Sequence, residues 1–170
     1  MTERDTVRSF LERDHARLDQ LLARAGRDSG NIDMETFGEF RRGLLKHIGM
    51  EEKILFPAIQ RLRGGEPLAI AASLRLDHGA IAALLVPTPR GAVLRALRTV
   101  LARHNPVEEG PDGVYAECDR IAGVEAEALV GRLRAAPEVP AAAHTDGPKV
   151  ESAARRALVR SGFDAALLDS

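Results

Sequence analysis

The sequence contains one cysteine and no excess of either charge. Cys118 is alone among 170 residues, which excludes a disulfide framework or a thiolate zinc site within one chain. The 24 Lys and Arg residues balance 25 Asp and Glu residues, for a formal net charge of −1 at pH 7. The basic residues are spread evenly, without the stripe that marks a surface for nucleic acid or an anionic membrane. We therefore expect neither nucleic acid nor a membrane among the partners.

Long apolar segments are also missing. The longest apolar run, near Leu68 to Leu74, is far too short to cross a bilayer. The polar stretch at residues 1–15 lacks the apolar core of a signal peptide. A content of 45% hydrophobic and 29% charged residues is typical of a globular protein. We expect a cytoplasmic protein, and 170 residues suit one domain with a short appendage.

Helical periodicity dominates the sequence, and no segment shows the alternating pattern of a strand. Short connections with Gly and Pro separate the helical segments, and Asn31 or Asp33 is expected to cap the second. Four amphipathic helices with short connections predict an all-α, up-down-up-down four-helix bundle. The helices are expected at about residues 5–25, 33–63, 68–86 and 91–104, and the helical pattern resumes at about 114–134.

The composition changes after the predicted bundle. Residues 136–149 contain several Pro, Ala and Gly residues and are typical of a linker. A short amphipathic pattern follows and predicts a further helical segment. We therefore predict a bundle domain over residues 1–135, a linker over 136–149 and a C-terminal helical segment over 150–170. This last segment either docks on the bundle or serves a protein partner.

Each of the four predicted helices carries a histidine on its apolar face, and two add a glutamate four residues later. On the second helix, His47 and Glu51 belong to an apolar face with alternating three- and four-residue spacing, which runs from Phe37 through Ile54 to Ala58. The adjacent Glu52 falls off this face and is expected to point away from the core. The six polar residues at core positions are His15, His47, Glu51, His78, His104 and Glu108.

These six residues together indicate a metal site. A single histidine on an apolar face is most often a core residue with local hydrogen-bond partners. Four imidazoles and two carboxylates in one bundle core would carry a heavy desolvation cost without compensation. Metal ions offset that cost because they bind neutral imidazole and carboxylate oxygen. Nitrogen and oxygen ligands without thiolate suit iron or manganese, and zinc would fit on geometry alone.

The pattern occurs twice in the chain. Each half has an Asp-His pair, then the motif H-x-x-x-E-E, then an aromatic residue, Phe56 in the first half and Tyr115 in the second. Two such halves in an antiparallel bundle are related by a pseudo-twofold axis, which suits two metal ions bridged by both glutamates. The pairs and motifs lie at residues 14–15 and 47–52, and at residues 77–78 and 104–109.

This arrangement resembles the hemerythrin-like, or HHE cation-binding, family. The resemblance covers about residues 5–134, and its most specific piece is HIGMEEKILFP at residues 47–57. It implies a non-haem di-iron centre with two iron ions, the six core residues as ligands, and a small diatomic ligand such as dioxygen or nitric oxide. The chain resembles the variants with four histidines, because Leu74 and Ala82 flank His78 where a fifth histidine would lie.

Some positions near the predicted ligands leave alternatives open. Pro106 lies between His104 and Glu108, and a proline inside a helix removes a hydrogen bond and clashes with the preceding turn. Glu109 is therefore an alternative to Glu108 as the second bridging carboxylate. A ferritin-like di-iron site would need E-x-x-H on two helices, and the sequence has one copy, so we expect Glu12 to face solvent.

The residues that flank the ligands have simpler expected roles. Asp14 and Asp77 precede ligand histidines and cannot share their helix face, so we expect exposed charges. The alternative is a hydrogen bond to a neighbouring ligand. Phe56 and Tyr115 are expected to form walls of the site, and the alternative for Tyr115 is that its hydroxyl is offered to a bound ligand. Cys118 is expected to be a small core residue.

Three functions fit these observations. The first, which we favour, is a module that binds or senses iron or a small ligand, dioxygen or nitric oxide. The second is a di-iron enzyme that consumes peroxide or oxidises ferrous iron, or an iron donor in nitrosative-stress repair. The third is an interaction module in which the metal is structural and the C-terminal segment recruits a protein partner. Whether the chain is an enzyme stays open at this point.

Overall fold

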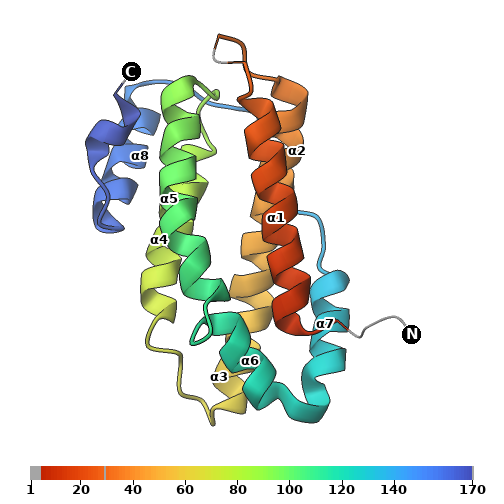
Figure 1. Cartoon of the computed structure of the whole chain (residues 1–170). Coiled ribbons are helices and arrows are strands. Elements are labelled where there is room, and N and C mark those ends of the chain that lie inside the picture. Colours follow the sequence, from red (N-terminus) through yellow and green to blue (C-terminus); the bar gives the residue numbers. More distant parts are fainter. Residues whose placement is uncertain (1–4, 29, 170) are drawn as a thin grey trace.

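The computed structural model describes residues 5–28 and 30–169, which form helices and loops without a strand. The long helices α1 (Val7–Ala25), α2 (Met34–Met50), α4 (Ala71–Leu84) and α5 (Gly91–Glu109) run side by side in alternating directions (Figure 1). The predicted all-α, up-down-up-down four-helix bundle is therefore confirmed. No helix within the described ranges is long and apolar enough to span a membrane.

Local hydrogen bonds set where the first two helices begin. The Thr6 hydroxyl accepts the Ser9 amide at 3.0 Å, and the Ser9 hydroxyl accepts the Thr6 amide at 3.0 Å. The Asp33 carboxylate accepts the Thr36 amide at 3.1 Å and so caps α2. Of the two predicted caps, Asp33 is thus the one that the structure uses.

The second helical stretch changes its winding in the middle. α2 passes into a π-helical turn, η1 (Glu51–Leu55), and then into α3 (Phe56–Leu62). The wider turn moves the buried positions by one residue, so Leu55 is fully buried while Ile54 is half-buried. The predicted apolar face is therefore wrong at Ile54, whereas Ala58, which the same face predicted, is buried. π turns inside α-helices are frequent at functional sites, and this one begins at a predicted ligand.

The fourth long helix continues through its proline. α5 extends to Glu109, so the predicted end near His104 is wrong. Pro106 lies in the last turn of α5, where the loss of one amide leaves the remaining bonds intact, and the Gly110 amide donates to the Pro106 carbonyl at 3.0 Å. Because the helix persists, Glu108 stays on the buried face one turn after His104.

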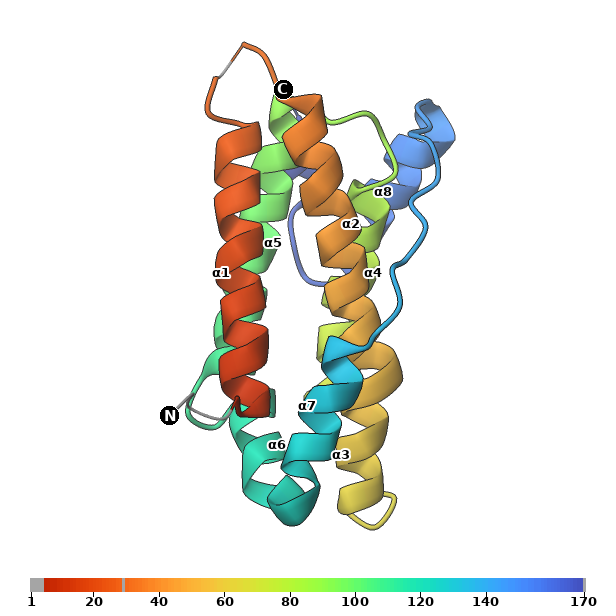
Figure 2. The ribbon, with the colours of Figure 1, turned by 90° about the vertical axis from the view of Figure 1, so that its right-hand side faces the viewer.

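Two short α-helices and the 3₁₀ turn between them close one end of the bundle. α6 (Val114–Ala122), the 3₁₀ turn η2 (Gly123–Glu125) and α7 (Ala126–Arg134) lie beside α3 at this end (Figure 2). The helical pattern predicted over residues 114–134 is interrupted at Gly123, whose φ of 50° favours glycine. Tyr115 and Cys118 on α6 are fully buried.

The rest of the chain returns along the bundle and packs on its side. After α7 the chain runs back along α2 (Figure 2), where Arg41 donates to the Ala142 carbonyl at 2.6 Å and Lys46 pairs with Glu138 at 2.6 Å. The helix α8 (Pro148–Arg160) and the 3₁₀ turn η3 (Ala165–Leu168) then lie against α4 and α5 (Figure 1). The C-terminal segment therefore docks on the bundle.

Candidate metal centre

The six predicted ligands form a polar layer between two apolar clusters of the core. Along α1, His15 lies between Leu11, which belongs to one cluster, and Leu18, which belongs to the other. Glu51 and Glu108 are fully buried in this layer. The histidines of the layer are exposed by no more than 4%: His15, His47, His78 and His104. The tertiary structure thus brings all six side chains together, out of reach of bulk water.

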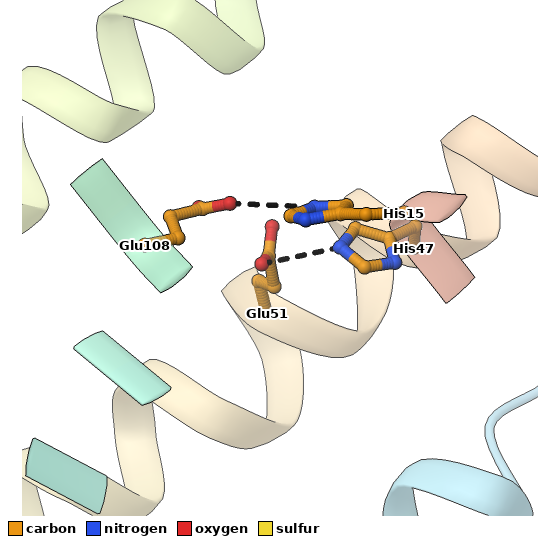
Figure 3. A group of neighbouring side chains, drawn as sticks. All are labelled: His15, His47, Glu51 and Glu108. Carbon is orange, nitrogen blue, oxygen red and sulfur yellow. Dashed lines mark ion pairs between the residues drawn. The ribbon is translucent and has the colours of Figure 1, made fainter. Parts of the chain in front are cut away.

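The first group of ligands combines α1 and α2 with the two glutamates (Figure 3). His47 Nε2 lies 3.3 Å from Glu51 Oε1, and His15 Nε2 lies 3.5 Å from Glu108 Oε2. One ligand atom from each of these four residues lies within 4.8 Å of all the others. We call the point between these four atoms position 1.

The second group combines α4 and α5 with the same glutamates, and we call its centre position 2. His78 Nε2 lies 3.2 Å from Glu51 Oε2, and His104 Nε2 lies 3.0 Å from Glu108 Oε1. Glu51 therefore turns Oε1 toward position 1 and Oε2 toward position 2, and Glu108 also divides its oxygens between the two positions. Each of the two carboxylates thus offers one oxygen to each group of histidines.

Three buried atoms at position 2 are left without hydrogen bonds within the described chain. They are Glu51 Oε2, His78 Nε2 and Glu108 Oε1. A buried polar atom without a partner costs free energy, and a cation between these atoms would remove that cost. Imidazole nitrogen and carboxylate oxygen are ligands that iron, manganese and zinc accept. The residues present therefore fit a bound metal.

A ring of acidic residues holds the four histidines from outside. Each Nδ1 meets a carboxylate on a neighbouring helix, and each carboxylate comes from the helix that precedes in the ring. The acid on α1 bonds to the histidine on α2, and the acid on η1 bonds to the histidine on α4. The acid on α4 bonds to the histidine on α5, and the acid on α5 bonds to the histidine on α1. A carboxylate acceptor places the imidazole proton on Nδ1 and leaves the lone pair of Nε2 for a metal. The pairs are Asp14–His47 at 2.8 Å, Glu52–His78 at 2.6 Å, Asp77–His104 at 3.2 Å and Glu109–His15 at 2.6 Å.

This ring corrects several expectations. Asp77 is 4% exposed and Asp14 is half-buried, so the exposed charges expected at both positions are wrong and the alternative, a bond to a neighbouring ligand, is what the structure shows. Glu52 leaves the α2 core face as expected but reaches His78. Glu109 binds the outer nitrogen of His15, so Glu108 alone of this pair lies between the two positions. Each of these outer acids directly adjoins a predicted ligand in the sequence, and this adjacency is the signal that could have identified them.

The two aromatic residues of the repeat differ in what they bring to the centre. The Tyr115 hydroxyl donates to Glu51 Oε1 at 2.5 Å and lies 3.3 Å from Nε2 of both His15 and His47. Phe56 stacks on His78 with 6.1 Å between ring centroids. Phe56 is therefore a wall of the site as expected, whereas Tyr115 places a polar atom at position 1.

The carboxylates make the layer strongly attractive to positive charge. Burial lowers the pKa of His47, but the charge of Glu51 and the bond to Asp14 outweigh it and raise the pKa to about 10. The same balance raises the pKa of His78 to about 11 and that of His104 to about 9. Burial raises the pKa of Glu51, yet His47 and His78 hold that pKa well below its usual range. The layer therefore favours bound positive charge, for which protons and a metal cation compete.

Glu12 and Cys118 lie outside the two ligand groups. Glu12 pairs with Arg8 at 2.5 Å on the outside of α1, with 35% of its side chain exposed, and belongs to neither ligand group. Burial raises the pKa of Cys118 to about 12, so the thiol stays protonated and behaves as the core residue expected.

The fold and the site together define a helical-bundle protein with a buried histidine–carboxylate cation site. The family model of the hemerythrin HHE cation binding domain matches residues 6–112. This match covers more than half of the 170 residues, so the chain belongs to that family. The matched range contains the six candidate ligands, while Tyr115 and α8 lie beyond it. No curated protein and no solved structure matches the chain.

Proposed function

We propose that this protein holds two iron ions and uses them to bind or sense a small ligand, dioxygen or nitric oxide. The observation that carries the proposal is the division of oxygens by Glu51 and Glu108 between two groups of histidines. Each position would receive two imidazole nitrogens and two carboxylate oxygens, which leaves room for a further ligand. Bound iron would supply the redox chemistry and the open coordination that diatomic ligands require. Manganese or zinc would fit the same donors.

The residues around the ligands prepare the centre in distinct ways. The outer acids keep each imidazole proton on Nδ1 and fix the direction of Nε2, as in other histidine metal sites. Burial, with the charges of Glu51 and Glu108, raises the pKa of Tyr115 well above its usual range, so its phenol keeps its proton and donates to Glu51. This hydroxyl fills space at position 1.

Metal analysis after reconstitution with ferrous iron under anaerobic conditions tests the proposal. Wild-type protein should hold about two irons per chain. His47→Ala should lose iron, whereas His144→Ala should keep it because His144 lies outside both ligand groups. A folded wild-type protein that takes up no ferrous iron would contradict the proposal.

Optical spectra of the loaded protein then separate the three functions. A reversible absorption change with dioxygen or nitric oxide supports ligand binding or sensing. Turnover with peroxide or ferrous iron supports the enzymatic alternative. A stable centre that responds to neither supports a structural metal.

A further inference from the structure

The outer partner of His104 is connected to a part of the chain beyond the matched domain. Oδ2 of Asp77 accepts a hydrogen bond from Nδ1 of His104 at 3.2 Å. The other oxygen of Asp77, Oδ1, accepts two more hydrogen bonds. One comes from Arg103 Nη2 at 2.6 Å, and the other comes from the hydroxyl of Ser161. Ser161 follows Asp77 by 84 residues and lies outside residues 6–112. A residue of the C-terminal segment therefore touches the hydrogen-bond shell of position 2.

The end of α8 is built so that Ser161 reaches this point. Gly162 has a φ of 81°, and the Phe163 amide donates back to the Leu158 carbonyl at 2.9 Å, which closes the helix with a Schellman motif. Ser161 is the last residue before this turn and is 8% exposed. The buried residues of α8 join the core cluster to which α1, α2, α4 and α5 all contribute; they are Ala154, Ala157 and Leu158.

Arg103 fastens this end of α8 to the bundle. The same Nη2 that binds Asp77 donates to the Ser161 carbonyl at 2.6 Å and lies 3.2 Å from its hydroxyl oxygen. The guanidinium carbon of Arg103 also lies 3.6 Å from the centre of the Phe163 ring. One side chain thus holds Asp77 and the C-terminal segment at once.

The connection is specific to one histidine. Asp14 takes its second partner, Arg17, from its own helix, and Glu52 takes Arg75 from α4. Within the described ranges, neither these two acids nor Glu109 hydrogen-bonds to the C-terminal segment. Position 2 is therefore supported by residues 148–169, whereas position 1 is not.

We propose that Ser161 is a positioning residue for metal position 2, and that residues 148–169 belong to the metal centre rather than forming an arm for a partner protein. This inference rests on the proposed metal centre. Ser161 and Arg103 hold Oδ1 of Asp77, so Oδ2 stays aligned with Nδ1 of His104. The imidazole then presents Nε2 to position 2.

Titration of the metal-free, full-length protein with cobalt(II) tests this role, because the visible absorption of cobalt reports its coordination. Loss of an outer-shell partner typically costs about 10- to 100-fold in metal affinity. Ser161 bonds to such a partner rather than to a ligand, and Arg103 still holds Asp77 in the variant, so Ser161→Ala should weaken one of the two binding equivalents by up to about tenfold and leave the other unchanged. Ser161→Thr keeps the hydroxyl and should restore the wild-type titration.

Ser152→Ala is the matched control, because Ser152 lies on the same helix with an exposed side chain. It should titrate as wild type. If wild-type protein binds no cobalt, the proposed metal centre itself fails. If wild-type protein binds two equivalents and Ser161→Ala binds both equally well, or weakens both equally, the role of Ser161 alone is overturned.

Amide hydrogen exchange on wild-type protein gives a second test that needs no substitution. Coupling between two sites is reciprocal, so support of position 2 by this segment requires that metal at position 2 stabilise the segment. Saturation with cobalt should slow exchange of the amides at residues 161–163. The loop residues 138–142 along α2 serve as the internal reference. Equal exchange at 161–163 with and without cobalt would overturn the inference.

Discussion

Positions 1 and 2 are built from two copies of one sequence motif, yet their surroundings differ. Position 1 has the phenol of Tyr115 within 3.3 Å of both of its histidines. Position 2 has the apolar ring of Phe56 and an outer acid tied to the C-terminal segment through Ser161. The repeated motif therefore gives both positions the same types of ligand. Residues outside the H-x-x-x-E motif give the two positions different neighbours.

The two halves also reach the same ligand geometry by different helix distortions. In the first half, a π turn begins at Glu51 and Pro57 follows it, in the first turn of α3. In the second half, α5 keeps its winding and Pro106 lies between His104 and Glu108. Both glutamates are nevertheless fully buried between the two positions. The two copies thus bring a glutamate to the same buried layer although their local helix geometry differs.

The largest effect is expected from a ligand that both positions share. Glu51→Ala should lower the metal content from about two ions to about none, because Glu51 offers one oxygen to each position. His104→Ala should remove the ion of position 2 and leave about one. Metal analysis, with circular dichroism to show that the helices persist, makes the measurement. Glu39→Ala, an exposed change on the same helix as His47, is the control. Equal metal contents in Glu51→Ala and His104→Ala would contradict the bridging role.

Substitution of either aromatic residue should change how much the metal affinities of the two positions differ. Tyr115→Phe removes the donor to Glu51 Oε1 and should weaken metal at position 1 by about tenfold, as for other partners of ligands. Phe56→Tyr is the reciprocal variant and adds a phenol on the side of position 2. Cobalt titration resolves the two equivalents. A titration unaffected by Tyr115→Phe would show that the phenol has no influence on the metal.

The histidines should make the stability of the metal-free protein fall with rising pH. Their folded-state pKa values of about 9 for His104, 10 for His47 and 11 for His78 lie above the ordinary value of 6.5. The contribution to the free energy of unfolding is therefore fully present below pH 6.5 and is lost as the pH rises through 9 to 11. The thermal midpoint of chelator-treated protein should decrease over this range, and metal affinity should increase because protons no longer compete. A midpoint that rises from pH 7 to pH 10 would contradict these assignments.

The smallest effect is expected from the arginines that pair with the outer acids at the surface. Arg17 binds Asp14 beside position 1 and Arg75 binds Glu52 beside position 2, with exposed side-chain fractions of 51% and 49%. Exposed ion pairs contribute less than about 1 kcal/mol, so Arg17→Ala and Arg75→Ala should each lower the free energy of unfolding by less than that. Denaturant titration measures this, and a loss of several kcal/mol in either variant would mean that the outer ring is far more rigid than these exposures imply.

Much of the fold could be predicted because apolar periodicity is a local property. The spacing of residues such as His47 and Glu51 on the α2 face predicted both the helix and the inward direction of the ligands. The π turn at Glu51 and the continuation of α5 through Pro106 could not be predicted, because core packing decides them against local preference. The burial of Asp77 against its expected exposure could not be predicted for another reason. Asp77 lies off the core face of its own helix, and its burial depends on α5 and α8, which cover it.

By itself, the sequence determined the class of fold, the duplicated motif and which six side chains enter the core, because each follows from residue type and helical period along one helix. The tertiary structure alone decided how the helices are rotated against one another. That rotation closes the ring from Asp14 to Glu109, brings the Tyr115 hydroxyl to position 1 and seats Ser161 on Asp77. The physical reason is that a hydrogen bond between helices depends on the approach of both backbones, which no single helix encodes.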